Sequence, residues 1–276
     1  MRNRLLALVA TVLVAATSVS AKETVTFAYD AYAEFTSTYI WRGQYNGGLS
    51  FQPDLAVGFD SEHTSFRFGT WWSVGASDWG FRKNVIPTEE EEEEGINPNT
   101  YFVPETDIYL NADIWGLTIG GTKYHFYNNS NFAKDGLWEV SLGYNFGTLL
   151  NVPLTITGNV FVAGSDDQDD NGEQMYSTYL EVAYYHTWEK YGITFGGAMG
   201  MSLRGQYYAD AATICNMSLR LDKTWNIADI CEIGIFGVGS LNPDGINKDN
   251  ALIWASGDNK VCCQKLNGAI GLSLAF

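Results

Sequence analysis

Hydrophobic and polar residues alternate along most of the chain. The clearest case covers residues 49–60, where small or polar residues separate Leu49, Phe51, Pro53, Leu55, Val57 and Phe59. Because successive side chains of a strand point to opposite faces, this pattern predicts a strand with one apolar and one polar face. Helical spacing does not appear at comparable length. The alternation alone leaves open whether the apolar face packs in a core or contacts lipid.

About twelve segments carry this pattern, and most are longer than the roughly 5–6 residues typical of strands in soluble proteins. They match the ~9–11 residues that a strand needs to cross a membrane. The predicted strands are 24–42, 48–60, 64–75, 105–115, 117–127, 136–146, 152–163, 174–187, 192–203, 211–223, 229–240 and 262–276.

The connections alternate between short turns and long loops, the long ones being 76–104, 128–135, 164–173, 204–210 and 241–261. Short periplasmic turns and long outer loops are typical of outer-membrane barrels, and closure satisfies the strand edges as a bilayer requires. The sequence therefore predicts an all-β fold, a transmembrane antiparallel up-and-down β-barrel. Tryptophans near strand ends would form the interfacial belts: Trp41, Trp115, Trp138, Trp188 and Trp225.

The first residues indicate export. Arg2 and Arg4 precede an apolar run and then small residues before Lys22, which is the layout of a cleaved signal peptide. We expect a signal peptide at 1–21 and a single barrel domain at 22–276. The final strand ends on Phe276 and resembles the assembly signal of Gram-negative outer-membrane barrels, which implies the barrel assembly machinery as a partner and the outer membrane as the location.

The formal net charge of −16 argues against binding to nucleic acid, which requires clustered basic residues. On the predicted polar face, acidic residues outnumber basic ones. We expect the following side chains to line the lumen: Asp30, Glu34, Arg42, Asp54, Asp60, Arg67, Asp107, Asp113, Glu139, Glu181 and Arg220. Such a lining would favour cations. Pairing of 64–75 with 105–115 predicts an ion pair between Arg67 and Asp113.

Six consecutive glutamates, Glu89, Glu90, Glu91, Glu92, Glu93 and Glu94, lie in the longest predicted loop. Like charges repel, so a solvated spacer is the favoured interpretation over capture of a divalent ion or a basic partner. The four cysteines, Cys215, Cys231, Cys262 and Cys263, lack the spacing of a zinc site, and their disulfide pairing stays open. No P-loop or dinucleotide motif occurs, so neither a metal nor a cofactor is predicted.

Residues of the first hairpin resemble those of the TorF-type family of outer-membrane porins. The matching positions are Tyr39, Trp41, Arg42, Gly43, Gly48, Gln52 and Pro53. The resemblance implies a small outer-membrane barrel with a channel role, although the long acidic loop is not a feature of that family.

The predicted function is a narrow, cation-preferring diffusion channel for small ions or solutes. The alternative is a structural or adhesive barrel with a plugged lumen, acting through loops 76–104 and 241–261. An enzyme is not predicted, because His63, His125 and His186 have no partnered nucleophile motif. The solute and the oligomeric state are left open.

Overall fold

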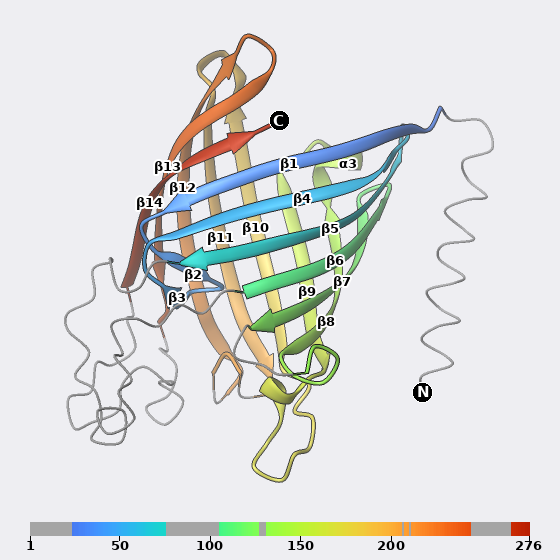
Figure 1. The fold of residues 1–276 in the computed structure, drawn as a ribbon, viewed down its shortest axis with the longest axis vertical. Coiled ribbons are helices and arrows are strands. Elements are labelled where there is room, and N and C mark those ends of the chain that lie inside the picture. The colour runs from blue at the N-terminus through green and yellow to red at the C-terminus, as the bar shows by residue number, and fades with distance from the viewer. Residues whose placement is uncertain (1–23, 76–104, 127–130, 206, 210, 244–265) are drawn as a thin grey trace.

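A computed structural model describes residues 24–75, 105–126, 131–205, 207–209, 211–243 and 266–276 (Figure 1). The predicted signal peptide, the six glutamates at 89–94, Cys262 and Cys263 lie outside these residues. Within them, no helix is long and apolar enough to cross a membrane.

Twelve strands form a closed antiparallel barrel in which each strand pairs with its neighbour along the chain and the last pairs with the first. The fold prediction is therefore confirmed. The barrel strands are β1 (Thr26–Thr36), β4 (Ser50–Asp60), β5 (Thr64–Gly75), β6 (Glu105–Ile114), β7 (Leu117–Phe126), β8 (Leu137–Asn145), β9 (Leu154–Ala163), β10 (Thr178–Trp188), β11 (Ile193–Arg204), β12 (Thr213–Ile227), β13 (Cys231–Leu241) and β14 (Leu266–Ala275).

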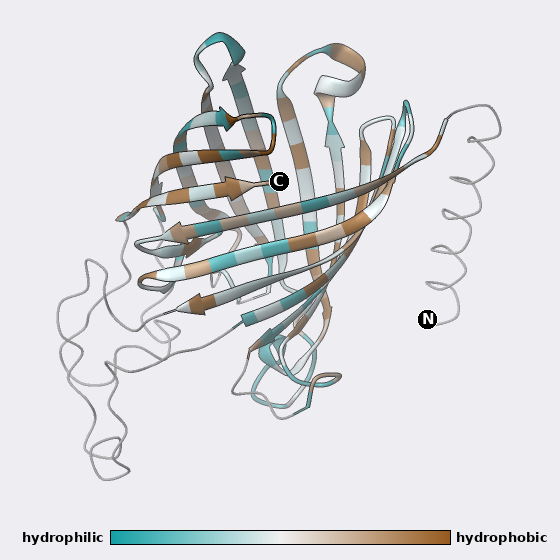
Figure 2. Ribbon diagram, turned by 45° about the horizontal axis from the view of Figure 1, so that its top comes forward, coloured by the Kyte–Doolittle hydropathy of each residue, from teal (hydrophilic) through white to brown (hydrophobic). Residues whose placement is uncertain are grey.

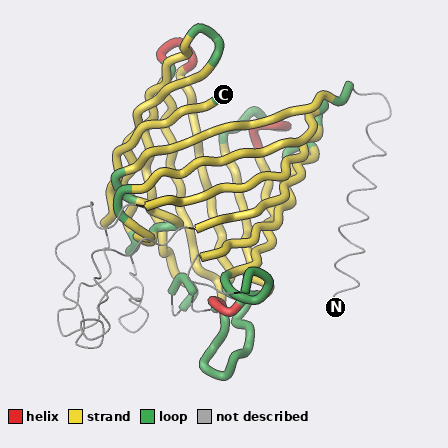
Figure 3. Tube along the Cα trace, in the orientation of Figure 1, coloured by secondary structure: helices red, strands yellow, loops and turns green. Residues whose placement is uncertain are grey.

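Helical structure is confined to short pieces in the connections, as Figure 3 shows. They are α3 (Phe146–Leu150), η2 (Ser165–Asp167) and η3 (Glu189–Tyr191). Both α3 and η3 lie in turns at the end of the barrel from which β1 starts, whereas η2 belongs to a loop at the opposite end (Figure 1).

The outer face of the barrel is apolar. Phe27 and Leu266 are 66% and 73% exposed, and the apolar residues of β4 identified from the alternation are exposed in the same way, apart from the half-buried Pro53. Figure 2 shows the alternation of hydrophobic and hydrophilic residues along the strands. A closed barrel with so much exposed apolar surface has the character of a transmembrane barrel, because lipid is the solvent that such a surface requires.

Most of the predicted belt tryptophans lie on the outside. Trp115, Trp138, Trp188 and Trp225 are exposed, and each lies at or near a strand end. Trp41 does not join them, because its ring packs inside the barrel against Tyr124 and Tyr208. The prediction was wrong for this residue.

The register of β5 and β6 differs from the prediction by two residues. Arg67 lies opposite Asn111, and Ser65 lies opposite Asp113, so the expected pairing of Arg67 with Asp113 does not form. The observed register places Tyr109 opposite Gly69, and its ring covers the glycine so closely that an added Cβ would lie 2.4 Å from the hydroxyl oxygen. An aromatic ring over a strand glycine is a recognised means of pinning register.

The predicted first strand, 24–42, was also wrong in its second half. The barrel strand β1 ends at Thr36, and the next residues form a separate two-stranded sheet of β2 (Tyr39–Trp41) and β3 (Gln44–Gly47). Ser37 still bonds to the barrel: it donates its backbone N–H to the carbonyl of Ile270 at 2.9 Å, and its hydroxyl oxygen accepts from the Ile270 N–H at 3.0 Å. Beyond Ser37 the chain leaves the barrel wall, and β4 brings it back. We call residues 38–49 the lumen hairpin.

A bulge in β12 turns one more residue inward. Met201 pairs with Ile214 and Gly200 pairs with Asn216, so Cys215 is the extra residue of β12 at this shift of register. Cys215 is buried, whereas Met217 and Leu219 beyond it are exposed. The alternation had grouped all three on one face, and the extra residue breaks that period.

Candidate functional site

The lumen hairpin folds into the barrel and reverses direction at Arg42 and Gly43. Trp41 pairs with Gln44 across this two-residue turn, and both turn residues have positive φ, 49° and 83°. Positive φ at both central residues defines a type I′ turn, which matches the twist of a hairpin. Gly43 has a second role, because a Cβ there would lie 2.5 Å from the carbonyl oxygen of Cys215 in β12.

At the tip of the hairpin, Arg42 forms a buried ion pair with Glu139 of β8. Nη1 lies 2.5 Å from Oε2 and Nη2 lies 2.9 Å from Oε1, a bidentate geometry. The two side chains are only 13% and 4% exposed. Arg42 also donates to the Tyr208 hydroxyl, and Glu139 accepts from the Tyr124 hydroxyl at 3.1 Å. The hairpin is therefore held to the opposite wall by a charged contact with little access to water.

Aromatic side chains surround this ion pair. The Arg42 guanidinium lies 4.6 Å from the ring centre of Trp41 and 4.8 Å from that of Tyr179. Phe161 and Tyr208 stack with their ring centres 5.6 Å apart. These residues come from the hairpin, from β9 and β10, and from the segment between β11 and β12. Together with Tyr124 and Leu137 they form a hydrophobic core inside the barrel.

Other contacts of the hairpin reach further around the wall. The Tyr39 ring lies 5.4 Å from that of Trp71 in β5. Asn267 of β14 donates its side-chain amide to the carbonyl of Gly43 at 3.1 Å. The hairpin therefore crosses the lumen and narrows it, whereas the sequence predicted a barrel strand that continues to residue 42 and a short connection to the next strand.

A second charged cluster centres on Arg67 of β5, away from the hairpin. Its Nε lies 2.6 Å from Asp30 of β1, and its two terminal nitrogens lie 2.7 and 2.9 Å from Asp60 of β4. The sequence placed all three side chains on one face, but it assigned Arg67 the wrong partner.

A third cluster centres on Arg220 of β12. Nη2 lies 2.6 Å from Glu34 of β1 and 2.8 Å from Asp222, and Nε lies 2.9 Å from the same Asp222 oxygen. The guanidinium also lies 4.1 Å from the ring centre of Phe236. This contact joins two strands that lie on either side of β13 and β14.

The remaining predicted lumen carboxylates form no ion pair with a basic side chain within the described part of the chain. Asp54 accepts from the Tyr109 hydroxyl at 2.6 Å, and Asp113 accepts from the Thr118 hydroxyl at 2.8 Å. Glu181 accepts from the Tyr179 hydroxyl at 3.0 Å. Asp107 is buried, and its Oδ1 has no hydrogen-bond partner. Among the described residues, no cluster of three or more His, Cys, Asp or Glu side chains could hold a metal ion.

Sequence reasoning missed the aromatic half of the site. Tyr124 and Tyr179 occupy the polar face of their strands, two residues from Thr122 and Glu181, so the alternation contained a signal for them. Tyr207 and Tyr208 fall in a predicted loop, and no local pattern marks them as buried.

Comparisons with known proteins find two solved structures of low similarity. No family model and no curated protein sequence matches the chain, so the resemblance to TorF-type porins stays a prediction. The COG4313 outer membrane channel from Pseudomonas putida F1 has 11% identity and a TM-score of 0.43, covering 91% of this chain and 94% of that one. OccK9 (OpdG) from Pseudomonas aeruginosa has 8% identity and a TM-score of 0.26, covering 92% and 98%. At such low sequence identities and TM-scores, only the chain's own residues can support a function.

Proposed function

We propose that this chain is a narrow, cation-preferring diffusion channel of a Gram-negative outer membrane. The observation that carries the proposal is a closed barrel with an apolar outside and a charged inside, narrowed by a hairpin that folds into the lumen.

The cation preference rests on the balance of charge along the lumen wall. Each of the three arginines is already paired with one or two carboxylates. Asp54, Asp113 and Glu181 have only hydroxyl or backbone partners among the described contacts, so their charge is not compensated by a nearby cation. A net negative lining lowers the energy of a passing cation and raises that of an anion.

Reversal potential tests this proposal. The mature chain, residues 22–276, is refolded and inserted into a planar bilayer under a salt gradient. We expect steady conductance with a cation-favouring reversal potential, and the Asp54→Asn/Glu181→Gln variant should move that potential toward zero. The matched control is Asp169→Asn, which removes one carboxylate outside the strands. An anion-favouring potential in the unaltered chain would refute the cation preference.

One observation favours the alternative of a structural or adhesive barrel. The lumen hairpin contacts β5, β8, β12 and β14, and a hydrophobic core fills part of the interior. If the filling is complete, the folded barrel will not conduct. Deleting residues 89–94 then separates the two functions: loss of ligand or cell binding with unchanged permeability supports adhesion, and a changed ion preference supports a channel.

A further inference from the structure

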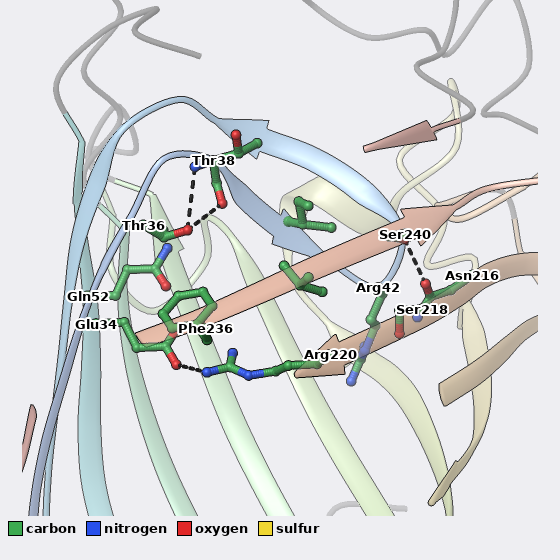
Figure 4. Close-up of a pocket in the computed structure, with 13 residues that line it drawn as sticks. Glu34, Thr36, Thr38, Arg42, Gln52, Asn216, Ser218, Arg220, Phe236 and Ser240 are labelled. Carbon is green, nitrogen blue, oxygen red and sulfur yellow. Dashed lines mark hydrogen bonds and ion pairs between the residues drawn. The ribbon is translucent and has the colours of Figure 1, made fainter. Parts of the chain in front are cut away.

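A polar cavity lies beside the lumen hairpin, on the side away from the aromatic core. Its volume is about 130 Å³, and its walls are the hairpin, β1, β4, β12 and β13 (Figure 4). Hydroxyl and amide side chains dominate the lining: Thr36, Thr38, Gln52, Asn216, Ser218 and Ser240.

The charged residues of the cavity are already paired. Arg220 is held by Glu34 and Asp222, and Arg42 is held by Glu139. Figure 4 shows the Glu34–Arg220 contact along one side of the cavity. An anion entering it would meet the Glu34 carboxylate, and a cation would meet two guanidinium groups. Neither sign of charge finds an unpaired counter-charge in the lining.

The neutral groups, in contrast, keep unused hydrogen-bonding capacity. Gln52 donates its amide to the Ser50 hydroxyl at 2.8 Å, which leaves its carbonyl oxygen as an acceptor. Ser240 donates to Asn216 at 3.0 Å, and its oxygen can still accept. The Thr38 hydroxyl is buried and has no partner. A buried polar group without a partner costs free energy, which a ligand hydroxyl would recover.

We propose that this cavity is a binding site for a small, uncharged polyhydroxyl solute of the monosaccharide class. Such a solute carries hydroxyl groups that donate and accept at once, as this mixed lining requires. The site deepens the channel proposal and rests on it for the route by which the solute arrives. Cation preference, by this reasoning, arises at the unpaired carboxylates elsewhere on the wall and not at the cavity.

Three probes of similar size and different charge test the site: glucose, gluconate and glucosamine. Saturation-transfer NMR on the refolded mature chain, in a detergent without a sugar head group, reports weak binding without requiring conductance. The test variant, Thr38→Val/Ser218→Ala, removes two cavity hydroxyls. The matched control, Ser141→Ala/Thr157→Val, removes two hydroxyls from the polar faces of β8 and β9, outside the cavity.

We expect a glucose signal that exceeds those of gluconate and glucosamine. It should fall by about tenfold in the test variant, since each lost hydrogen bond weakens binding several-fold, and stay unchanged in the control. The site is refuted if glucose gives no signal, if either charged probe gives the stronger signal, or if both variants behave alike. A folded barrel that binds glucose without conducting would keep the site and remove the channel, whereas conductance without glucose binding would do the reverse.

Discussion

Replacing Glu139 with glutamine should loosen the lumen hairpin and raise the conductance of the barrel. The substitution keeps the shape of the side chain and leaves the Arg42 charge buried at 13% exposure without its bidentate partner. Breaking a buried ion pair at one partner costs about 3–5 kcal/mol. Contacts of Arg42 with Tyr208 and Tyr179 remain, so we take about 3 kcal/mol, which changes the ratio of docked to undocked hairpin by about two orders of magnitude.

Single-channel recording of the refolded chain measures this change. We expect larger mean conductance and more current fluctuation in Glu139→Gln than in the unaltered chain. Asp113→Asn is the control, because Asp113 is a carboxylate on the polar face with no ion pair to a basic side chain among the described residues, and an amide oxygen can keep accepting from Thr118. Equal conductance and noise in Glu139→Gln and Asp113→Asn would show that the ion pair does not hold the hairpin in place.

Three further predictions concern stability, electrostatics and assembly. Gly69→Ala should lower the free energy of unfolding in urea by roughly 1–3 kcal/mol, since its Cβ would collide with a tyrosine ring, whereas Gly237→Ala, with open space around it, should not. Hydrogen bonds from the Glu173, Asn171 and Gly172 backbones lower the pKa of Asp169, so an NMR titration of the Glu173 amide should have its midpoint below about 3.9. The hydrogen-bonded loop around Asp169 should stay ordered above a pH of about 3.9, the ordinary pKa of an aspartate, and should lose its order as the pH falls through the lowered pKa of Asp169. A titration midpoint at or above about 3.9 would refute this. Deleting Phe276 should reduce outer-membrane insertion in cells while in vitro refolding is retained, and equal insertion would argue against the assembly-signal interpretation.

The barrel could be predicted from sequence because its main constraint is local. Lipid outside and water or charge inside impose a period of two on every strand, and that period is visible without any partner strand. The same period placed Asp30, Glu34 and Arg220 on the polar face of their strands. On that face the ion pairs Asp30–Arg67 and Glu34–Arg220 connect separate strands of the barrel.

Contacts across the lumen could not be predicted in the same way. Residues 37–42 continue the alternation of β1, and the chain turns inward there because of contacts with residues far along the sequence, among them Glu139, Tyr208 and Asn267. The register of β5 and β6 was open for a related reason. The long connection between them sets no fixed offset, so the packing of Tyr109 over Gly69 decides it.

Removing the lumen hairpin tests the central claim most directly. A variant with residues 39–47 replaced by a short glycine–serine link keeps all twelve barrel strands, and its conductance can be compared with that of the unaltered chain in the same bilayer. If the chain is a channel narrowed by this hairpin, the unaltered protein will conduct in steady steps and the variant in clearly larger ones. Equal steps, or no conductance from a folded unaltered barrel, would contradict the account.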